Sequence, residues 1–275
     1  MDIINLESDK LIVKVSPLLG GRVDSIIYKP TQKNWVWKNT HLKDEPVSKY
    51  LNYDDNWQGG WEELYPNDAI ENFSWGKGLD HGELWSASWD IDFTNTHQVK
   101  LSTKNLDSGT VFYKSINIKE NTIKVDYKAD IKFIDNFLFK LHLAVPIDEN
   151  TEVICDFQKI EKVDKNFGNI LENDKKFFKL KKNSGDFDFA YIDLNKKGVI
   201  IKDSLNNSMK LNYGEENLKY FWMFQSQGGW RGHNVLVLEP SSNSKKYLLD
   251  AAKDKKVLKG PLKFNCNYSV EFDND

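Results

Sequence analysis

Apolar and polar residues alternate with a period of two through most of the chain. Successive side chains of a β-strand point to opposite faces, so this alternation predicts strands that bury one face. Clusters of Asn, Asp, Gly and Lys separate the runs and predict turns. The runs are KLIVKVSP (10–17), RVDSIIYKP (22–30), NWVWKN (34–39), LWSASWDIDF (84–93), TVFYKSINI (110–118), NTIKVDYKADIKF (121–133), FLFKLHLAVPI (137–147), FDFAYIDL (187–194), KGVIIKD (197–203), SMKLNY (208–213), KYFWMFQ (219–225), NVLVLEP (234–240) and FNCNYSVEF (264–272).

Little helical periodicity lies between the predicted strands. The best helix candidates are LKDEPVSKYLNY at 42–53 and a turn near 160–172, and both are short. Parallel strands need a crossover of about a dozen residues, usually a helix, whereas antiparallel strands do not. The pattern therefore predicts an all-β protein with antiparallel sheets.

A length of 275 residues suits one large β domain or two domains of average size. No recurring unit is visible, which disfavours propellers and solenoids. The span 173–186, rich in Lys, Asn and Asp, has alternating runs on both sides. We interpret it as a long turn inside a single domain that covers residues 1–275.

The charges of the chain are nearly balanced, with 38 Lys and Arg against 41 Asp and Glu and a formal net charge of −3. This balance gives no reason to expect nucleic acid or an anionic membrane surface as a partner, and it favours a small or uncharged molecule. No window approaches the roughly 18 consecutive apolar residues that span a bilayer. We expect a soluble protein without an export signal.

The two cysteines, Cys155 and Cys266, lie in alternating runs and lack CxxC spacing. Buried reduced thiols and a disulfide are both compatible with this pattern, and we favour the thiols. Reduced thiols suit a reducing compartment, so we expect a cytoplasmic protein.

Tryptophans concentrate beside glycines in two parts of the chain, 57–89 and 222–230. An aromatic face can stack on the C–H surface of a sugar ring while nearby carboxylates and amides bind its hydroxyls. Trp57, Trp61 and Trp230 lie in loop contexts, where exposure is easier, and are candidates for such a site.

The stretch DHGELWSASW at 80–89 places His81 between two carboxylates, at the start of a predicted strand. A lone histidine is usually structural, but a residue that begins a strand after a loop often faces a cleft. Trp85 and Trp89 are four residues apart, on one face of this predicted strand, and we expect them in the core.

Two more titratable residues lie on apolar strands. His142 shares a strand face with Lys140 and Ala144, and Glu239 ends the run NVLVLEP, where we expect Pro240 to stop the strand. Such residues can have shifted pKa values and exchange protons at neutral pH. A structural histidine and a solvated strand end are the alternatives.

The other basic side chains give weaker signals. His41 and His97 lie in polar surroundings and are expected at the surface, while His233 is compatible with either environment. Arg22 and Arg231 are the only arginines, and either is suited to bind a hydroxyl or a phosphate.

Motifs for other chemistries are missing from the sequence. The HxH or HExxH spacing that would make a metal site specific does not occur. Neither a GxSxG elbow nor a GxGxxG or GxxxxGK[ST] loop is present, so acyl transfer and nucleotide use have no support.

Together, these motifs resemble the aldose 1-epimerase (galactose mutarotase-like) family. The resemblance extends in order from about residue 11 to 272, through GGRVDSIIY (20–28), GGWEELYPND (59–68), DHGELWSASW (80–89), FKLHLAVPI (139–147), LVLEP (236–240) and GPLKFNCNYSVEF (260–272). It implies an antiparallel β-supersandwich in one domain, a sugar site on a concave face, and no cofactor or metal.

The resemblance also implies roles for individual residues. Glu239 matches the general base that removes the anomeric proton, His142 the general acid that protonates the ring oxygen, and His81 a second histidine that binds sugar and supports that proton delivery. Opening a hemiacetal moves one proton off O1 and one onto the ring oxygen, which a carboxylate and an imidazolium can do. The further substrate-binding candidates are Trp61, Glu62, Glu83, Arg22 and Trp230.

One segment departs from the family pattern. Well-known mutarotases carry Asn-His-x-Tyr-Phe-Asn-Leu at the middle histidine, where this chain has KLHLAVPI. The aspartate that holds distal sugar hydroxyls in those enzymes has no clear counterpart.

Three functional hypotheses follow. The first is an aldose 1-epimerase, a cofactor-independent isomerase that interconverts the α and β anomers of a small sugar. The alternative is a non-catalytic carbohydrate-binding protein, because a fold does not fix activity. A third is a metal-dependent sugar isomerase that uses His81, Glu83 and His142. The sequence leaves the sugar and the oligomeric state open.

Overall fold

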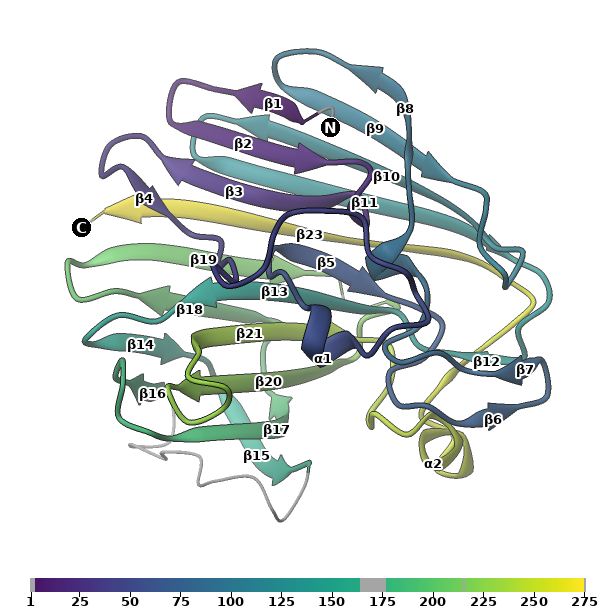
Figure 1. The fold of residues 1–275 in the computed structure, drawn as a ribbon. Helices are drawn as coiled ribbons and strands as arrows, with labels where there is room; N and C mark the ends of the chain where they lie inside the picture. Colours follow the sequence, from purple (N-terminus) through teal and green to yellow (C-terminus); the bar gives the residue numbers. More distant parts are fainter. Residues whose placement is uncertain (1–2, 164–176, 215, 275) are drawn as a thin grey trace.

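The computed structural model describes residues 3–163, 177–214 and 216–274 and consists mainly of two large antiparallel sheets (Figure 1). The ten-stranded sheet has the order β1 (Ile4–Glu7), β2 (Leu11–Ser16), β3 (Arg22–Tyr28), β5 (Trp61–Leu64), β13 (Lys140–Pro146), β21 (Asn234–Ser241), β20 (Tyr220–Gln227), β17 (Phe187–Leu194) and β15 (Phe157–Lys162), with β4 (Lys33–Asn34) paired to β3.

The second sheet has nine strands, and short elements connect or flank the two sheets. Its order is β16 (Phe177–Leu180), β14 (Thr151–Ile154), β18 (Gly198–Lys202), β19 (Asn207–Tyr213), β23 (Leu262–Asn274), β11 (Thr122–Ile131), β10 (Val111–Lys119), β9 (Gln98–Thr103) and β8 (Asp90–Thr94). Two small sheets pair β6 (Asn72–Phe73) with β7 (Gly76–Lys77) and β12 (Asn136–Phe137) with β22 (Leu258–Lys259). The helical elements are α1 (Tyr53–Asn56), the 3₁₀ turn η1 (Leu84–Ser86) and α2 (Leu248–Lys253).

The core lies between the inner faces of the two sheets. Val13 and Leu143 of the ten-stranded sheet belong to the same packed cluster as Val125 and Val270 of the nine-stranded sheet. Burial alternates along β10 and β11, as the period of two in the sequence predicts. The expected all-β antiparallel sandwich is therefore confirmed.

Strand β13 is buried on both faces because loops cover the outer face of the ten-stranded sheet. Leu141 and Leu143 face the core, and Ala144 packs on the outer side in a second cluster with Trp57 and Trp222. The sequence alternation thus assigned the two faces of β13 correctly. The outer face of its central strands is the surface that carries the polar residues described below.

Two secondary-structure predictions are wrong near the start of the chain. Residues 42–53 do not form a helix, and the four-residue α1 begins only at Tyr53, capped by the side chain of Asn52, which accepts from the Asp55 N–H. The stretch 80–89 is not a strand: His81 has a φ of 58°, and η1 follows it. A left-handed residue reverses the chain and is incompatible with strand alternation.

Two further predictions need correction toward the C-terminus. Pro240 does not stop β21, which continues to Ser241, and Pro240 pairs with Phe221 of β20. The presumed turn 173–186 contains β16, which pairs with β14, while 173–176 lie outside the described residues. Of the candidate turn 160–172, residues 160–162 belong to β15 and 164–172 are not described.

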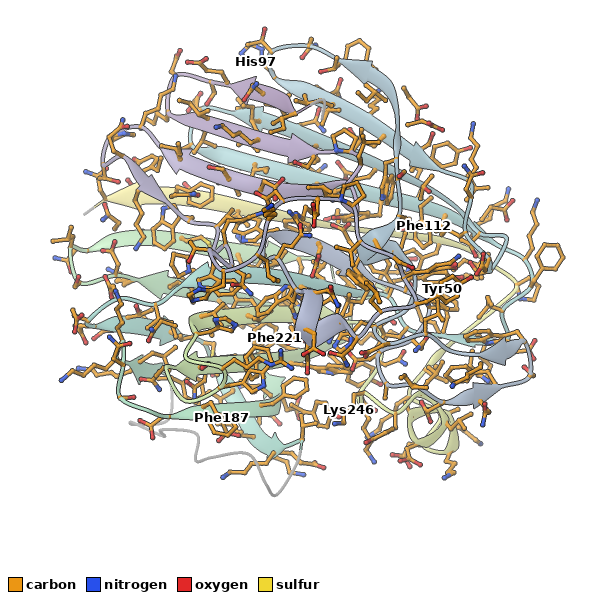
Figure 2. The ribbon with its side chains drawn as sticks, viewed as in Figure 1. Tyr50, His97, Phe112, Phe187, Phe221 and Lys246 are labelled. Atoms are coloured by element: carbon orange, nitrogen blue, oxygen red, sulfur yellow. The ribbon has the colours of Figure 1, made fainter. Side chains whose placement is uncertain are left out.

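Several simpler expectations are confirmed. Cys155 and Cys266 are buried free thiols. His41 and His97 are exposed, and Figure 2 shows His97 at the periphery of the molecule. Trp85 and Trp89 are buried, although in a turn and a loop rather than a strand. Within the described residues, no helix has the length and apolar character needed to cross a membrane.

Candidate active site

A cavity of about 160 Å³ lies on the outer face of the ten-stranded sheet. Its floor comes from β13, β17, β20 and β21, and its walls come from α1 and from the segments around residues 57, 68, 81, 230 and 246. The lining residues are Tyr53, Asp54, Trp57, Asp68, His81, Lys140, His142, Phe189, Phe224, Trp230, Glu239 and Lys246. The cavity therefore combines aromatic surface with carboxylates, two histidines and two lysines.

The sheet register brings the acidic and imidazole side chains of the floor together. Strand β13 pairs Lys140 with Ser241 and Leu143 with Leu238 of β21. This register sets His142 opposite Glu239. Directly bonded strands add Glu62 of β5 on one side of this pair and Trp222 of β20 on the other. Four residues from four strands thus form one row across the outer face.

His142 is held by a hydrogen-bonded chain that begins behind the cavity. The Tyr53 hydroxyl donates to Oε1 of Glu62 and lies 3.2 Å from Nδ1 of His142, which is 3.6 Å from the same carboxylate oxygen. Because the hydroxyl proton points to Glu62, the phenolic oxygen accepts the Nδ1 proton of His142. Nε2 is then the unprotonated nitrogen of the neutral ring.

Electrostatics keep His142 uncharged. Burial, followed by the positive charges of Lys140 and His81, holds its pKa well below the ordinary value. The pKa of Glu62 shifts in the opposite direction, since burial raises it to about 7 despite the hydrogen bond from Tyr53.

His81 lies in a turn whose geometry aims its ring at the cavity. Its backbone N–H donates to the carbonyl of Asp68 at 2.8 Å, and its ring stacks on Tyr53 with centroids 3.9 Å apart. Nδ1 lies 2.8 Å from Oδ1 of Asp80. Burial disfavours the imidazolium, but Asp68 and Asp80 outweigh it and raise the pKa of His81. The pKa values of the two histidines of the cavity are therefore shifted in opposite directions.

Glu239 is a buried carboxylate with one close cationic partner. Nζ of Lys140 lies 2.5 Å from Oε2 of Glu239 and 2.5 Å from Oδ2 of Asp68, so one ammonium serves two acids. Burial raises the pKa of Glu239, and Lys140 only partly opposes this effect. Asp68 differs, because Lys140 and His81 outweigh burial and lower its pKa.

Of the predicted substrate-binding residues, Trp230 lines the cavity and Glu62 lies behind His142. Trp61 does not reach the cavity. It is fully buried in the core between the sheets, and its Nε1 donates to the Ala144 carbonyl at 3.0 Å. Its glycine neighbours suggested a loop, but Trp61 begins β5, where alternation turns it inward and Glu62 outward. Trp57, the other loop tryptophan, does line the cavity.

Glu83 also lies away from the cavity. Its carboxylate accepts from the backbone N–H groups of Asp107 at 2.7 Å and Ser108 at 3.2 Å, on the far side of the Gly82 turn. It therefore does not join His81 and His142 as the metal hypothesis requires. Within the described part of the chain, no cluster of three or more His, Cys, Asp or Glu side chains is arranged to hold a metal ion.

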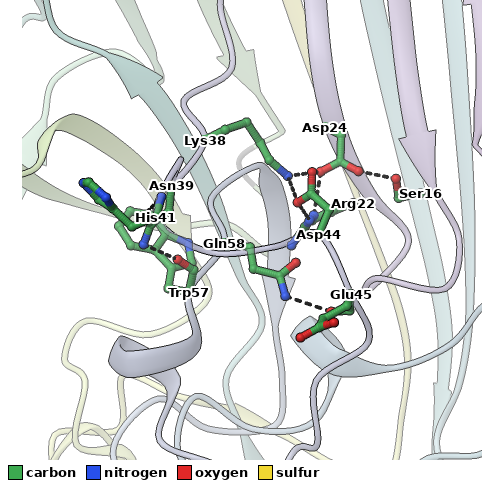
Figure 3. A network of polar contacts seen from close by, with 10 residues as sticks. All are labelled: Ser16, Arg22, Asp24, Lys38, Asn39, His41, Asp44, Glu45, Trp57 and Gln58. Carbon is green, nitrogen blue, oxygen red and sulfur yellow. Dashed lines mark hydrogen bonds and ion pairs between the residues drawn. The ribbon is translucent and has the colours of Figure 1, made fainter.

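Arg22 is engaged in a separate polar network (Figure 3). Its Nε lies 2.6 Å from Asp24 and its Nη2 lies 2.7 Å from Asp44, while Lys38 contacts both acids. The buried guanidinium links β3 to the loop that follows β4, through Asp44. Arg22 does not line this cavity, and its role in sugar binding stays a prediction.

Sequence reasoning missed several lining residues. Tyr53 lies in a segment interpreted as part of a helix, and Asp68 ends the GGWEELYPND motif without any spacing that points to a partner. Only Lys140 could have been found from the sequence pattern, since it is two residues before His142 and so lies on the same strand face.

The comparisons with known proteins identify the fold. No protein-family model and no curated protein matches the sequence. The Slr1438 protein of Synechocystis sp. PCC 6803 has a similar structure, with a TM-score of 0.79 and 12% identity over 100% of this chain and 96% of that chain.

Two galactose mutarotase-like proteins are similar over at least 95% of their length. The one from Lactobacillus casei ATCC 334 gives a TM-score of 0.74 at 11% identity, covering 99% of this chain and 100% of that chain. The one from Clostridium acetobutylicum gives 0.70 at 14% identity, covering 99% and 95%. These structures show that the fold is galactose mutarotase-like, as the sequence motifs predicted.

Proposed function

With a galactose mutarotase-like fold as the premise, we propose that this protein is an aldose 1-epimerase that interconverts the α and β anomers of a sugar by opening and reclosing its ring. The observation that carries the proposal is the meeting of Glu239, His81 and His142 in one cavity. These residues are separated by up to 158 positions in the sequence (239 − 81), so their convergence is a property of the fold.

Glu239 acts as the general base. Its raised pKa supports this role, because a carboxylate with increased basicity accepts the O1 proton more readily. Removing that proton lets the C1–O5 bond break, and O1 becomes the carbonyl oxygen of the open-chain aldehyde. Rotation about C1–C2 then presents the other face of the carbonyl to O5.

His81 acts as the general acid that protonates the ring oxygen. Its pKa is raised, and the Asp80 contact at Nδ1 leaves the Nε2 proton for the substrate. His142 is neutral, and its unprotonated Nε2 accepts a hydrogen bond from a sugar hydroxyl. This assignment reverses the two histidine roles that the resemblance implied.

The aromatic walls bind the sugar ring. Trp230 and Phe224 form an edge-to-face pair with centroids 5.3 Å apart, and both line the cavity. Flat aromatic surfaces suit the C–H face of a pyranose, while Asp54 and Lys246 can bind hydroxyls at the rim.

The test is the rate at which a freshly dissolved pure anomer equilibrates, followed by the NMR signals of the anomeric protons. Wild-type protein is expected to accelerate equilibration of at least one aldose in a panel, and Glu239→Gln to reduce the rate about 10²- to 10⁴-fold with the fold intact. Binding of a sugar without acceleration by the wild type would instead identify a non-catalytic carbohydrate-binding protein.

A further inference from the structure

Lys140, on the cavity floor, has no role in the proton transfers described above, yet it forms an ion pair with the proposed base. Its side chain is 2% exposed, and the face of Trp222 lies 4.5 Å from Nζ. A buried ammonium is unfavourable unless it is paired. Asp68 and Glu239 provide the pairing, and they raise the pKa of Lys140 despite burial.

The shared ammonium fixes the position of Glu239. Oε2 of Glu239 lies 2.5 Å from Nζ, and Trp222 is its direct neighbour on β20. A carboxylate restrained through one oxygen presents the other in a set direction. Positioning a base within hydrogen-bonding reach of its proton is a large part of general base catalysis.

The second carboxylate changes what the lysine does. Without Asp68, Lys140 would pair with Glu239 alone and would lower the pKa of Glu239, which makes the carboxylate a weaker base. Asp68 takes up part of that charge and itself repels a negative Glu239, which raises the pKa of Glu239. His81 also acts on Glu239 and lowers its pKa, Tyr53 and Tyr191 face the same carboxylate, and Asp54 and Lys246 line the same cavity.

We propose that Lys140 is a positioning residue that holds the Glu239 carboxylate in place, and that Asp68 shares the Lys140 ammonium so that Glu239 remains able to accept a proton. This inference rests on the proposed function for its catalytic meaning. The electrostatic coupling of the three side chains stands independently of activity, and it can be measured directly.

The experiment follows the Glu239 carboxyl by ¹³C NMR in protein labelled at glutamate, with the signal assigned by its loss in Glu239→Gln. Lys140→Met is expected to raise the pKa of Glu239 by about one pH unit or more, and Asp68→Asn to lower it. Lys140→Arg keeps the charge and is expected to stay near the wild-type value. A merely structural role would not move one carboxyl in opposite directions.

Lys33→Met is the matched control. Nζ of Lys33 also lies between a carboxylate, 2.6 Å from Asp203, and a tryptophan, 4.2 Å from the Trp35 ring, but outside the cavity. It is expected to leave the Glu239 titration unchanged. If Lys140→Met does not fold, Asp68→Asn and Lys140→Arg still decide the question.

The acid limb of kcat/KM for anomer equilibration is expected to move with the NMR titration in each variant. Glu239 shifts that are absent, or that have the same sign in Lys140→Met and Asp68→Asn, would overturn the inference. A wild-type protein that accelerates no sugar but shows the opposite shifts would contradict the proposed function and leave the coupling established.

Discussion

The ring of Tyr53 stacks on the imidazole of His81, with centroids 3.9 Å apart and planes 13° from parallel, and its hydroxyl contacts Nδ1 of His142 at 3.2 Å. One side chain of α1 therefore orients both histidines of the cavity. Because the hydroxyl also donates to Glu62, it sets which nitrogen of His142 carries the proton.

Tyr53→Phe tests this arrangement. The stacking on His81 is retained, but Nδ1 of His142 loses its acceptor, so we expect ¹⁵N NMR to show a mixture of His142 tautomers. The equilibration rate is expected to fall about tenfold, roughly the effect of one hydrogen bond on a positioned group. An unchanged tautomer in the variant would contradict the assigned chain.

The two histidines are expected to affect the pH profile differently. The kcat/KM for equilibration should rise as Glu239 ionises, above the ordinary glutamate range, and fall as His81 loses its proton, above the ordinary histidine range. His81→Gln should remove the alkaline limb, and His142→Gln should lower the rate but keep that limb. Loss of the limb in His142→Gln alone would restore the roles that the sequence resemblance implied.

Trp230 and Trp61, which the sequence grouped as sugar-binding candidates, should have different effects on sugar binding and on stability. Trp230→Ala is expected to weaken sugar binding with little change in Tm, because Trp230 lines the cavity. Trp61→Ala removes a fully buried ring from the core and should cost about 3–5 kcal/mol of the free energy of unfolding. Isothermal titration with sugar and thermal unfolding measure the two effects, and a large Tm loss in Trp230→Ala would contradict the placement.

Glu62 makes the stability of the fold depend on pH. Burial raises its pKa from 4.5 to about 7, because the folded protein favours the neutral acid. The contribution of Glu62 to the free energy of unfolding is therefore complete below pH 4.5 and is lost as pH rises through 7. Between pH 4.5 and 8 the wild type should therefore lose about 3 kcal/mol more than Glu62→Gln in denaturant unfolding. Glu161→Gln, at an exposed position of β15, is the control and should behave as the wild type.

The sequence predicted the strand faces better than it predicted the site. Alternation within one strand is a local property, so the sharing of a face by Lys140 and His142 was readable from the sequence. The pairing of β13 with β21, which sets His142 opposite Glu239, depends on strand order across about 100 residues (239 − 142 = 97). Only the resemblance of the motifs to a known family predicted that His142 and Glu239 lie in one site.

The errors have two physical origins. Trp61 follows two glycines that favour a turn, but hydrogen bonding of β5 to β13 extends the strand to this residue and turns its ring inward. His81 precedes an alternating run, but backbone contacts with Asp68 and Leu79 close a tight turn there instead. In both cases long-range pairing or turn hydrogen bonds overrode the local pattern.

Within the described residues, the lining of the cavity includes no residue from the nine-stranded sheet. The outward-facing positions of that sheet, such as Lys124 on β11 and Lys210 on β19, are therefore suitable for a fluorophore or a tether to a solid support. Protein immobilised through them would keep the mouth of the cavity open to dissolved sugar. This face is therefore suitable as the attachment site in a biosensor.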